Sequence, residues 1–181
     1  MRLFVAVDLP ATAKDELERV VERLRPSMPD AKWVPRDNIH LTLSFLGEVA
    51  EERIDGIVTA LGDAVGSLRP FGANLAGSGA FPSRRRARVL WAGLESDQDQ
   101  LPALADAVAA ALDPLGFARE ARAWTAHLTL ARFRTPADVS GLLPIAIEPN
   151  TVAVKDVTLF RSRLARPAPR YESVARVPLA G

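Results

Sequence analysis

His40-Leu41-Thr42-Leu43 recurs later in the chain as His127-Leu128-Thr129-Leu130, and these tetrapeptides hold the only two histidines among the 181 residues. The alternation of polar and apolar side chains is typical of a strand with one buried face, because successive side chains point to opposite sides. Each histidine then shares a face with its threonine, and the leucines lie on the other face. A single such histidine would most simply be structural, but two matched copies indicate a functional pair.

The repetition extends beyond the tetrapeptides, which stand 87 positions apart (127 − 40). The same offset moves the apolar, strand-like run 3–7 onto 90–94, inside another strand-like run. It also moves Leu17 and Val21 of one helical stripe onto Leu104 and Val108 of a second stripe. Each half of the chain therefore predicts a strand, a helix and then a histidine strand.

Further elements fill out both halves. Apolar spacing predicts one more helix, and its acidic first turn, Glu51 and Glu52, suits the helix dipole. That helix is marked by Ile54, Ile57, Val58, Leu61 and Val65. The two stripes named above are Leu17, Val20, Val21 and Leu24, and Leu101, Leu104, Val108, Leu112 and Leu115. The other expected elements are strands over 70–75, 151–160 and 171–177, a turn-rich connector over 78–83 and a loop over 166–169.

This mixture of helices and antiparallel or mixed strands predicts an α+β fold. We expect a single bilobal catalytic domain over 1–181, with lobe one at about 1–80 and lobe two at about 81–181. The C-terminal strands could be exchanged between the lobes. A pseudo-two-fold relation between the lobes would bring both histidine strands to one cleft.

Composition restricts the class of protein. Hydrophobic residues make up 48% and charged residues 25%, as in ordinary globular proteins. The absence of cysteine excludes disulfides and thiolate metal sites, which suits a reducing cytoplasm. No segment is long and apolar enough to cross a membrane or to act as a signal sequence, so we expect a soluble cytoplasmic protein.

The net charge of +1 gives the whole molecule little attraction for nucleic acid. The positive charge is nevertheless unevenly distributed, since nearly all of it is arginine. Either of two local clusters could contact a polyanion through its guanidinium groups, although a solvated turn is the simpler interpretation of each. The clusters are Arg84-Arg85-Arg86 with Arg88, and Arg161 with Arg163 and Arg166.

Two histidines opposed across a substrate can act as general base and general acid in one displacement. The threonine hydroxyls beside them can hydrogen-bond the non-bridging oxygens of a phosphate, so this quartet of side chains suits in-line phosphoryl transfer without a metal ion or other cofactor. A zinc site fits poorly, because no carboxylates complete a ligand set at suitable spacing. A Ser/His/Asp triad would leave the second histidine without a role.

The two motifs stand among further distinctive segments: Arg2-Leu3-Phe4-Val5-Ala6-Val7-Asp8-Leu9-Pro10, Trp33-Val34-Pro35, Ser44-Phe45-Leu46-Gly47, Gly79-Ala80-Phe81-Pro82, Val89-Leu90-Trp91-Ala92-Gly93 and Ala131-Arg132. In these segments the chain resembles the two-histidine (2H) phosphoesterase superfamily. It is most similar to the branch of RNA 2′,3′-cyclic phosphodiesterases, also called 2′-5′ RNA ligases. The resemblance covers nearly the whole chain.

This resemblance implies two antiparallel sheets facing across a central groove, with helices on the outside. It implies hydrolysis of RNA or nucleotide 2′,3′-cyclic phosphates to a 2′-phosphate, and reversible 2′-5′ joining of tRNA halves without a nucleotide cofactor. Carried onto this chain, His40 and His127 are catalytic, and Thr42 and Thr129 bind the phosphate. We expect His127 to be the base that activates water and His40 the acid that protonates the departing 3′ oxygen.

Arg132 follows the second motif, as the family pattern expects, and could neutralise phosphate charge. Strand alternation argues against this role, because position 132 faces away from His127 and Thr129 unless a bulge intervenes. Phe45, its counterpart 87 positions earlier, is expected in the core, although near the groove it could stack on a base. Ala126 departs from the family, in which proline often precedes the second histidine, and this affects loop rigidity rather than chemistry.

Two other functions stay open at this point. The chain could act on another small cyclic nucleotide or on 2′-5′ oligonucleotides, with the same quartet and different groove walls. It could also be a non-catalytic module that binds RNA ends, although binding alone would need arginine or lysine rather than two titrating imidazoles. The expected partner is RNA with a 2′,3′-cyclic phosphate end, including tRNA fragments, with no membrane partner and a monomeric state.

Overall fold

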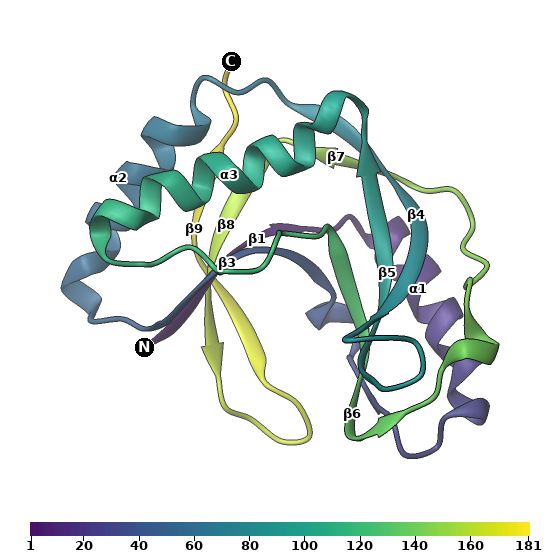
Figure 1. The fold of residues 1–181 in the computed structure, drawn as a ribbon. Coiled ribbons are helices and arrows are strands. Elements are labelled where there is room, and N and C mark those ends of the chain that lie inside the picture. Colours follow the sequence, from purple (N-terminus) through teal and green to yellow (C-terminus); the bar gives the residue numbers. More distant parts are fainter.

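All nine strands in the computed structural model, which describes residues 1–181, belong to one curled antiparallel sheet (Figure 1). The strands are β1 (Arg2–Asp8), β2 (Lys32–Trp33), β3 (His40–Glu48), β4 (Phe71–Phe81), β5 (Ala87–Ser96), β6 (His127–Ala137), β7 (Thr151–Val154), β8 (Asp156–Arg163) and β9 (Arg170–Pro178). Three helices, α1 (Ala11–Leu24), α2 (Ile54–Val65) and α3 (Gln100–Leu112), complete the α+β fold. The predicted fold class is therefore confirmed.

The two histidine strands are neighbours at the centre of the sheet. The strand order is β7-β4-β5-β6-β3-β1-β8-β9, and β2 pairs with β6 beside it. A single residue pair, Leu41 with Leu128, joins β3 to β6. The expectation of two separate sheets is wrong in this respect, because that pair makes one sheet whose halves diverge on either side of the junction. Pairing here also leaves neither histidine strand as a bare edge.

The predicted helical stripes are buried as expected. Leu17, Val20, Val21 and Leu24 of α1 pack into the core, and so do Leu101, Leu104, Val108 and Leu112 of α3. Figure 1 shows α2 and α3 together on one side of the molecule and α1 on the other, near β4 and β5. One contiguous core of 40 buried residues lies between these helices and one face of the sheet. The other face of the sheet is left to line the groove.

The predicted strand over 151–160 is two strands, because the ladder breaks at Lys155. On one side of this residue β7 pairs with β4, and on the other side β8 pairs with β1. These partners lie in opposite halves of the strand order, so the sheet must curl strongly for consecutive strands to reach both.

The predicted connector over 78–83 is also corrected, since β4 continues to Phe81 and the turn begins only after it. Glycine and serine in this segment suggested a turn, but Gly79 lies against the Trp91 ring, where a Cβ atom would come within 2.3 Å of the indole. Its glycine is therefore needed for close packing within a strand. The division of the chain into two lobes near residue 80 stays a prediction. None of the helices has the length and apolar character needed to cross a membrane.

Candidate active site

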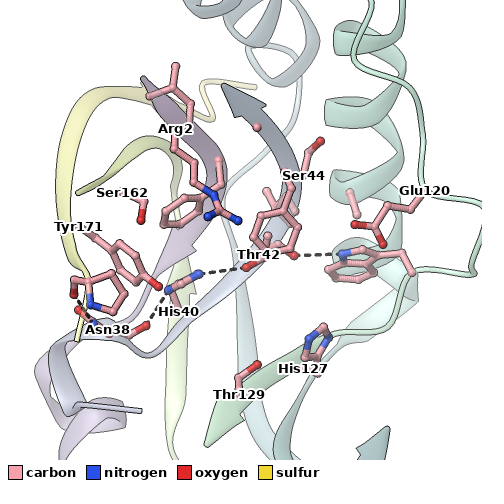
Figure 2. A pocket seen from close by; sticks show the side chains of 18 of the residues that line it. Arg2, Asn38, His40, Thr42, Ser44, Glu120, His127, Thr129, Ser162 and Tyr171 are labelled. Atoms are coloured by element: carbon pink, nitrogen blue, oxygen red, sulfur yellow. Dashed lines mark hydrogen bonds between the residues drawn. The ribbon is translucent and has the colours of Figure 1, made fainter. Parts of the chain in front are cut away.

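His40, Thr42, His127 and Thr129 all line one groove of about 1040 Å³. Figure 2 shows His40 and Thr42 on β3, and His127 and Thr129 on the adjacent β6. The leucines between them, Leu41 and Leu128, are fully buried on the opposite face. Burying such side chains contributes about 1.5–3 kcal/mol each, so core packing fixes which face carries the polar quartet. The alternation predicted from the tetrapeptides is present in both strands.

Both imidazole rings are held by the same kind of hydrogen bond, from Nδ1 to a backbone carbonyl two residues earlier in the chain. The Nδ1 atom of His40 lies 2.7 Å from the carbonyl oxygen of Asn38, and Nδ1 of His127 lies 2.9 Å from that of Thr125. Because a carbonyl can only accept, each Nδ1 carries the hydrogen in the neutral ring, and Nε2 is left with a lone pair. The Nε2 of His40 accepts the Thr42 hydroxyl hydrogen at 3.0 Å. The reactive nitrogen of each ring is thus Nε2.

Aromatic side chains fix the plane of each imidazole. His40 stacks on Phe4 with ring centroids 4.8 Å apart and meets the edge of Tyr171 at 5.3 Å. His127 meets Phe81 edge-on at 5.1 Å and lies near Trp91 at 6.4 Å. Phe4 and Trp91 are themselves related by the 87-residue offset. Ring contacts of this kind restrict the motion of the imidazoles and hold them ready for proton transfer.

Burial among these rings lowers the pKa of His40 from 6.5 to about 4, because the cationic form loses hydration. The Asn38 carbonyl and the Asp8 carboxylate act in the opposite direction but do not compensate. At neutral pH His40 is therefore uncharged in the open groove. To act as an acid it must first gain a proton, and an anionic phosphate beside it would favour that gain.

The ring of His40 is expected to titrate near pH 4 in the free protein. Adding inorganic phosphate or a nucleoside 2′-phosphate should raise that pKa, because the anion stabilises the imidazolium. Heteronuclear NMR of ¹⁵N-histidine-labelled protein measures both values, and the His127→Gln variant isolates the His40 signal. An unchanged titration near pH 6.5 in the free protein would contradict the burial argument.

The same shift has a consequence for stability. The unfolded chain binds a proton at His40 below pH 6.5, whereas the folded chain does so only below about 4, so stability falls as the pH drops through that window. The free energy of unfolding should decrease by about 2–3 kcal/mol between pH 7 and pH 4 through this residue. Urea unfolding of His40→Gln serves as the control, since that variant lacks this part of the pH dependence.

Arg132 and Phe45 both line the groove, which corrects the argument from strict alternation. In the pairing of β1 with β3, Leu43 is skipped, and in the pairing of β5 with β6, Leu130 is skipped. These two bulges, again 87 positions apart, reverse the alternation that follows them. Phe45 is 59% exposed rather than in the core, and Arg132 is exposed on the groove side.

The sequence interpretation missed the side chains that surround the quartet. Trp124 donates its indole hydrogen to the Thr42 carbonyl at 3.1 Å, and so fastens the loop before β6 to β3. Tyr171 comes from β9, at the far end of the strand order, and meets His40. A tryptophan three residues before the second motif was a usable signal. Nothing local in the sequence points from Tyr171 to His40.

The groove is equipped for an anion. Its lining holds five cationic side chains and two carboxylates, Asp106 and Glu120, of which Asp106 pairs with Arg119. The cations are Arg2, Lys32, Arg119, Arg122 and Arg132. No cluster of three or more histidine, aspartate or glutamate side chains suitable for a metal ion is present. Two imidazoles that each present an Nε2 lone pair, together with two hydroxyls and these cations, can hold a phosphate and move protons on both sides of it.

Comparison with known proteins gives consistent matches. The family model described as LigT like phosphoesterase matches residues 7–91 and 93–171. Two proteins named RNA 2′,3′-cyclic phosphodiesterase are similar over most of their length: that of Methanothermobacter thermautotrophicus is 30% identical (94% of this chain, 95% of the relative), and that of Thermotoga maritima is 32% identical (95% and 92%). The chain spans 57% of the length of a further relative of that name from Geobacillus stearothermophilus, to which it is 29% identical.

Solved structures match the same fold. The TT0787 protein of Thermus thermophilus superposes with a TM-score of 0.81 at 32% identity, covering 100% of this chain and 99% of that one. E. coli LigT in complex with 3′-AMP superposes with a TM-score of 0.75 at 30% identity, covering 99% and 98%.

Proposed function

Because the chain belongs to the LigT like phosphoesterase family, we propose that it hydrolyses 2′,3′-cyclic phosphate ends of RNA to 2′-phosphates without a metal ion. The resemblance to two-histidine phosphoesterases drawn from the sequence is confirmed by this family match. The observation that carries the proposal is the pair of imidazoles in one groove, each held through Nδ1 so that Nε2 carries the lone pair that can accept a proton.

The proposed reaction is an in-line displacement at the cyclic phosphorus. Nε2 of His127 accepts a proton from water as the water oxygen bonds to phosphorus. The bond from phosphorus to the 3′ oxygen breaks, and His40 gives that oxygen the proton on its own Nε2. His40 gains this proton when the anionic substrate binds. The Thr42 hydroxyl, which faces Nε2 in the open groove, then turns its hydrogen to a phosphate oxygen.

The remaining groove residues have supporting roles in this proposal. Thr42 and Thr129 hold the non-bridging oxygens, and Arg132 neutralises their charge. Phe45 offers an exposed ring to the terminal base, a stacking interaction of about 1–3 kcal/mol. With the 5′ hydroxyl of a second RNA strand in place of water, the same displacement at the cyclic phosphorus would form a 2′-5′ bond and release the 3′ oxygen, which would connect tRNA halves. The monomeric state and the cytoplasmic location stay predictions from the sequence.

The decisive experiment incubates the protein, in buffer with EDTA, with a short RNA that ends in a 2′,3′-cyclic phosphate. The expected product carries a 2′-phosphate, identified by chromatography against 2′- and 3′-phosphate standards. Absence of hydrolysis would favour a non-catalytic RNA-end-binding module. A product with a 3′-phosphate would contradict the proposed cleavage of the bond to the 3′ oxygen.

A further inference from the structure

A row of cationic side chains leads along β6 away from the histidine pair. Lys32 on β2 pairs opposite Arg132 on β6, and both line the groove. Arg134 follows two residues later, so it shares the face of Arg132, with the buried Phe133 between them on the other face. Arg84 and Arg85, in the turn between β4 and β5, continue this row beyond the end of β6. We call these five side chains, Lys32, Arg132, Arg134, Arg84 and Arg85, the cationic track.

The track ends in a second cleft of about 510 Å³, lined only by Ser83, Arg84, Arg85 and Ser140. No apolar residue contributes to its lining. Two guanidinium groups and two hydroxyls are hydrogen-bond donors of the kind that bind phosphate oxygens, and guanidinium can do so with two parallel hydrogen bonds. The composition of the cleft therefore suits a phosphate group.

The cleft is held in shape by the backbone. The turn between β4 and β5 carries both arginines and lies beside β6 (Figure 1). The Arg84 carbonyl accepts the N–H of the buried Val139 at 2.8 Å, which fixes the turn to the chain just beyond β6. The nearby Asp138 carboxylate accepts the backbone N–H of Ser140 at 2.9 Å.

No cation of the track forms a salt bridge, although the Asp138 carboxylate lies close enough to Arg85 for their charges to attract. In the other arginine cluster Arg163 is paired with Glu172 at 2.7 Å, whereas Arg161 and Arg166 form no salt bridge. For a chain with a net charge of only +1, five cations in one row concentrate the positive charge along one path. A solvated turn alone would not explain why this path begins at the histidines.

We propose that the cleft of Arg84 and Arg85 is a second phosphate-binding subsite, which holds a backbone phosphate of the RNA strand upstream of its cyclic end. The inference rests on the proposed function and adds to it that the substrate is an RNA strand rather than a mononucleotide. His127 and Ala137 stand at the two ends of β6, about 30 Å of extended strand. A stacked strand covers that distance in about nine nucleotides at 3.4 Å each, and an extended strand in fewer.

The experiment compares a nucleoside 2′,3′-cyclic phosphate with cyclic-ended RNAs of 4, 8 and 12 nucleotides. For the unmodified protein, KM should fall about tenfold as the RNA lengthens, and then level off once the strand reaches the subsite. In the double variant Arg84→Gln/Arg85→Gln, KM should no longer fall as the RNA lengthens. Its kcat should stay within twofold on every substrate, and its KM for the mononucleotide should not change.

The matched control is Arg69→Gln/Lys155→Gln. It removes the same charge from two exposed, unpaired side chains beside the opposite end of β4, away from the cleft. This control should keep the dependence on RNA length. The slope of log KM against log salt should fall by about 0.7 in the arginine variant alone, because one phosphate contact on a single strand accounts for about that much.

Three outcomes would overturn the subsite. The KM of the unmodified protein could be independent of RNA length, or the control variant could lose the length dependence as fully as the arginine variant. The arginine variant could also bind the mononucleotide as much more weakly as it binds the long RNA. Hydrolysis of neither substrate by the unmodified protein would instead mean that the proposed function has failed. Fluorescence anisotropy with a labelled 12-nucleotide RNA carrying a 2′-phosphate then decides the subsite separately. Weaker binding by the arginine variant than by the control supports it, and equal binding overturns it.

Discussion

Replacing either His40 or His127 by alanine is expected to lower kcat for the cyclic-ended RNA by about 10³–10⁴-fold. A positioned acid or base contributes about 10²–10⁴-fold, and the fixed rings place these residues near the upper end of that range. Rates from single-turnover assays in EDTA measure the loss. Circular dichroism and thermal melting show whether each variant keeps the native fold, which His127→Ala should do because that ring is only partly buried.

A sulfur-substituted substrate separates the roles of the two histidines. When the 3′ oxygen of the cyclic phosphate is replaced by sulfur, the leaving thiolate needs no proton, because thiols are far more acidic than alcohols. Loss of the acid should then cost little, whereas loss of the base should cost as much as before. We expect the thio substrate to restore His40→Ala and not His127→Ala. Restoration of His127→Ala instead would reverse the assignment, and equal losses with both substrates would contradict acid–base pairing.

Thr42→Val and Thr129→Val are each expected to lower kcat/KM by about 10²-fold. Valine has the shape of threonine, so packing is kept while one hydrogen-bond donor to the phosphate is lost. Removing one such donor in other enzymes costs about 10²–10³-fold. Steady-state kinetics with the cyclic-ended RNA measures the effect.

Thr42→Ser and Thr129→Ser provide the control, because serine keeps the hydroxyl and loses only a methyl group. They should stay within about tenfold of the unmodified protein. A valine variant that keeps more than a third of the original activity would show that its hydroxyl does not bind the transferred phosphate.

The pattern of polar and apolar residues was sufficient to predict the helices and the two histidine strands, with the face that each of them buries. The stripe of Leu17, Val20, Val21 and Leu24 gave a helix, and strict alternation in the tetrapeptides gave two strands with polar and buried faces. The same offset of 87 residues marked β5, α3 and β6 as counterparts of β1, α1 and β3. These features depend on residues within a few positions of each other, so one sequence contains the information.

The errors all involve long-range pairing. At Leu43 and Leu130, β3 and β6 each have one residue more than the neighbouring strand pairs with, which makes a bulge. No residue near either leucine in the sequence indicates that a bulge occurs there. The break at Lys155 likewise follows from which strands β7 and β8 pair with. The contact between Tyr171 and His40 joins residues that are 131 positions apart (171 − 40), so only the folded sheet brings them together.

The position of β8 and β9 beside β1 has a consequence for synthesis of the protein. β1 is synthesised long before β8, its outer partner in the sheet. Tyr171, which contacts His40, is synthesised 131 residues after it (171 − 40). At about 5–20 residues per second, the nascent chain spends several seconds with His40 synthesised but its surroundings incomplete. The aromatic surroundings of His40 are therefore expected to be completed only after β9 has been made, later than all four residues of the quartet.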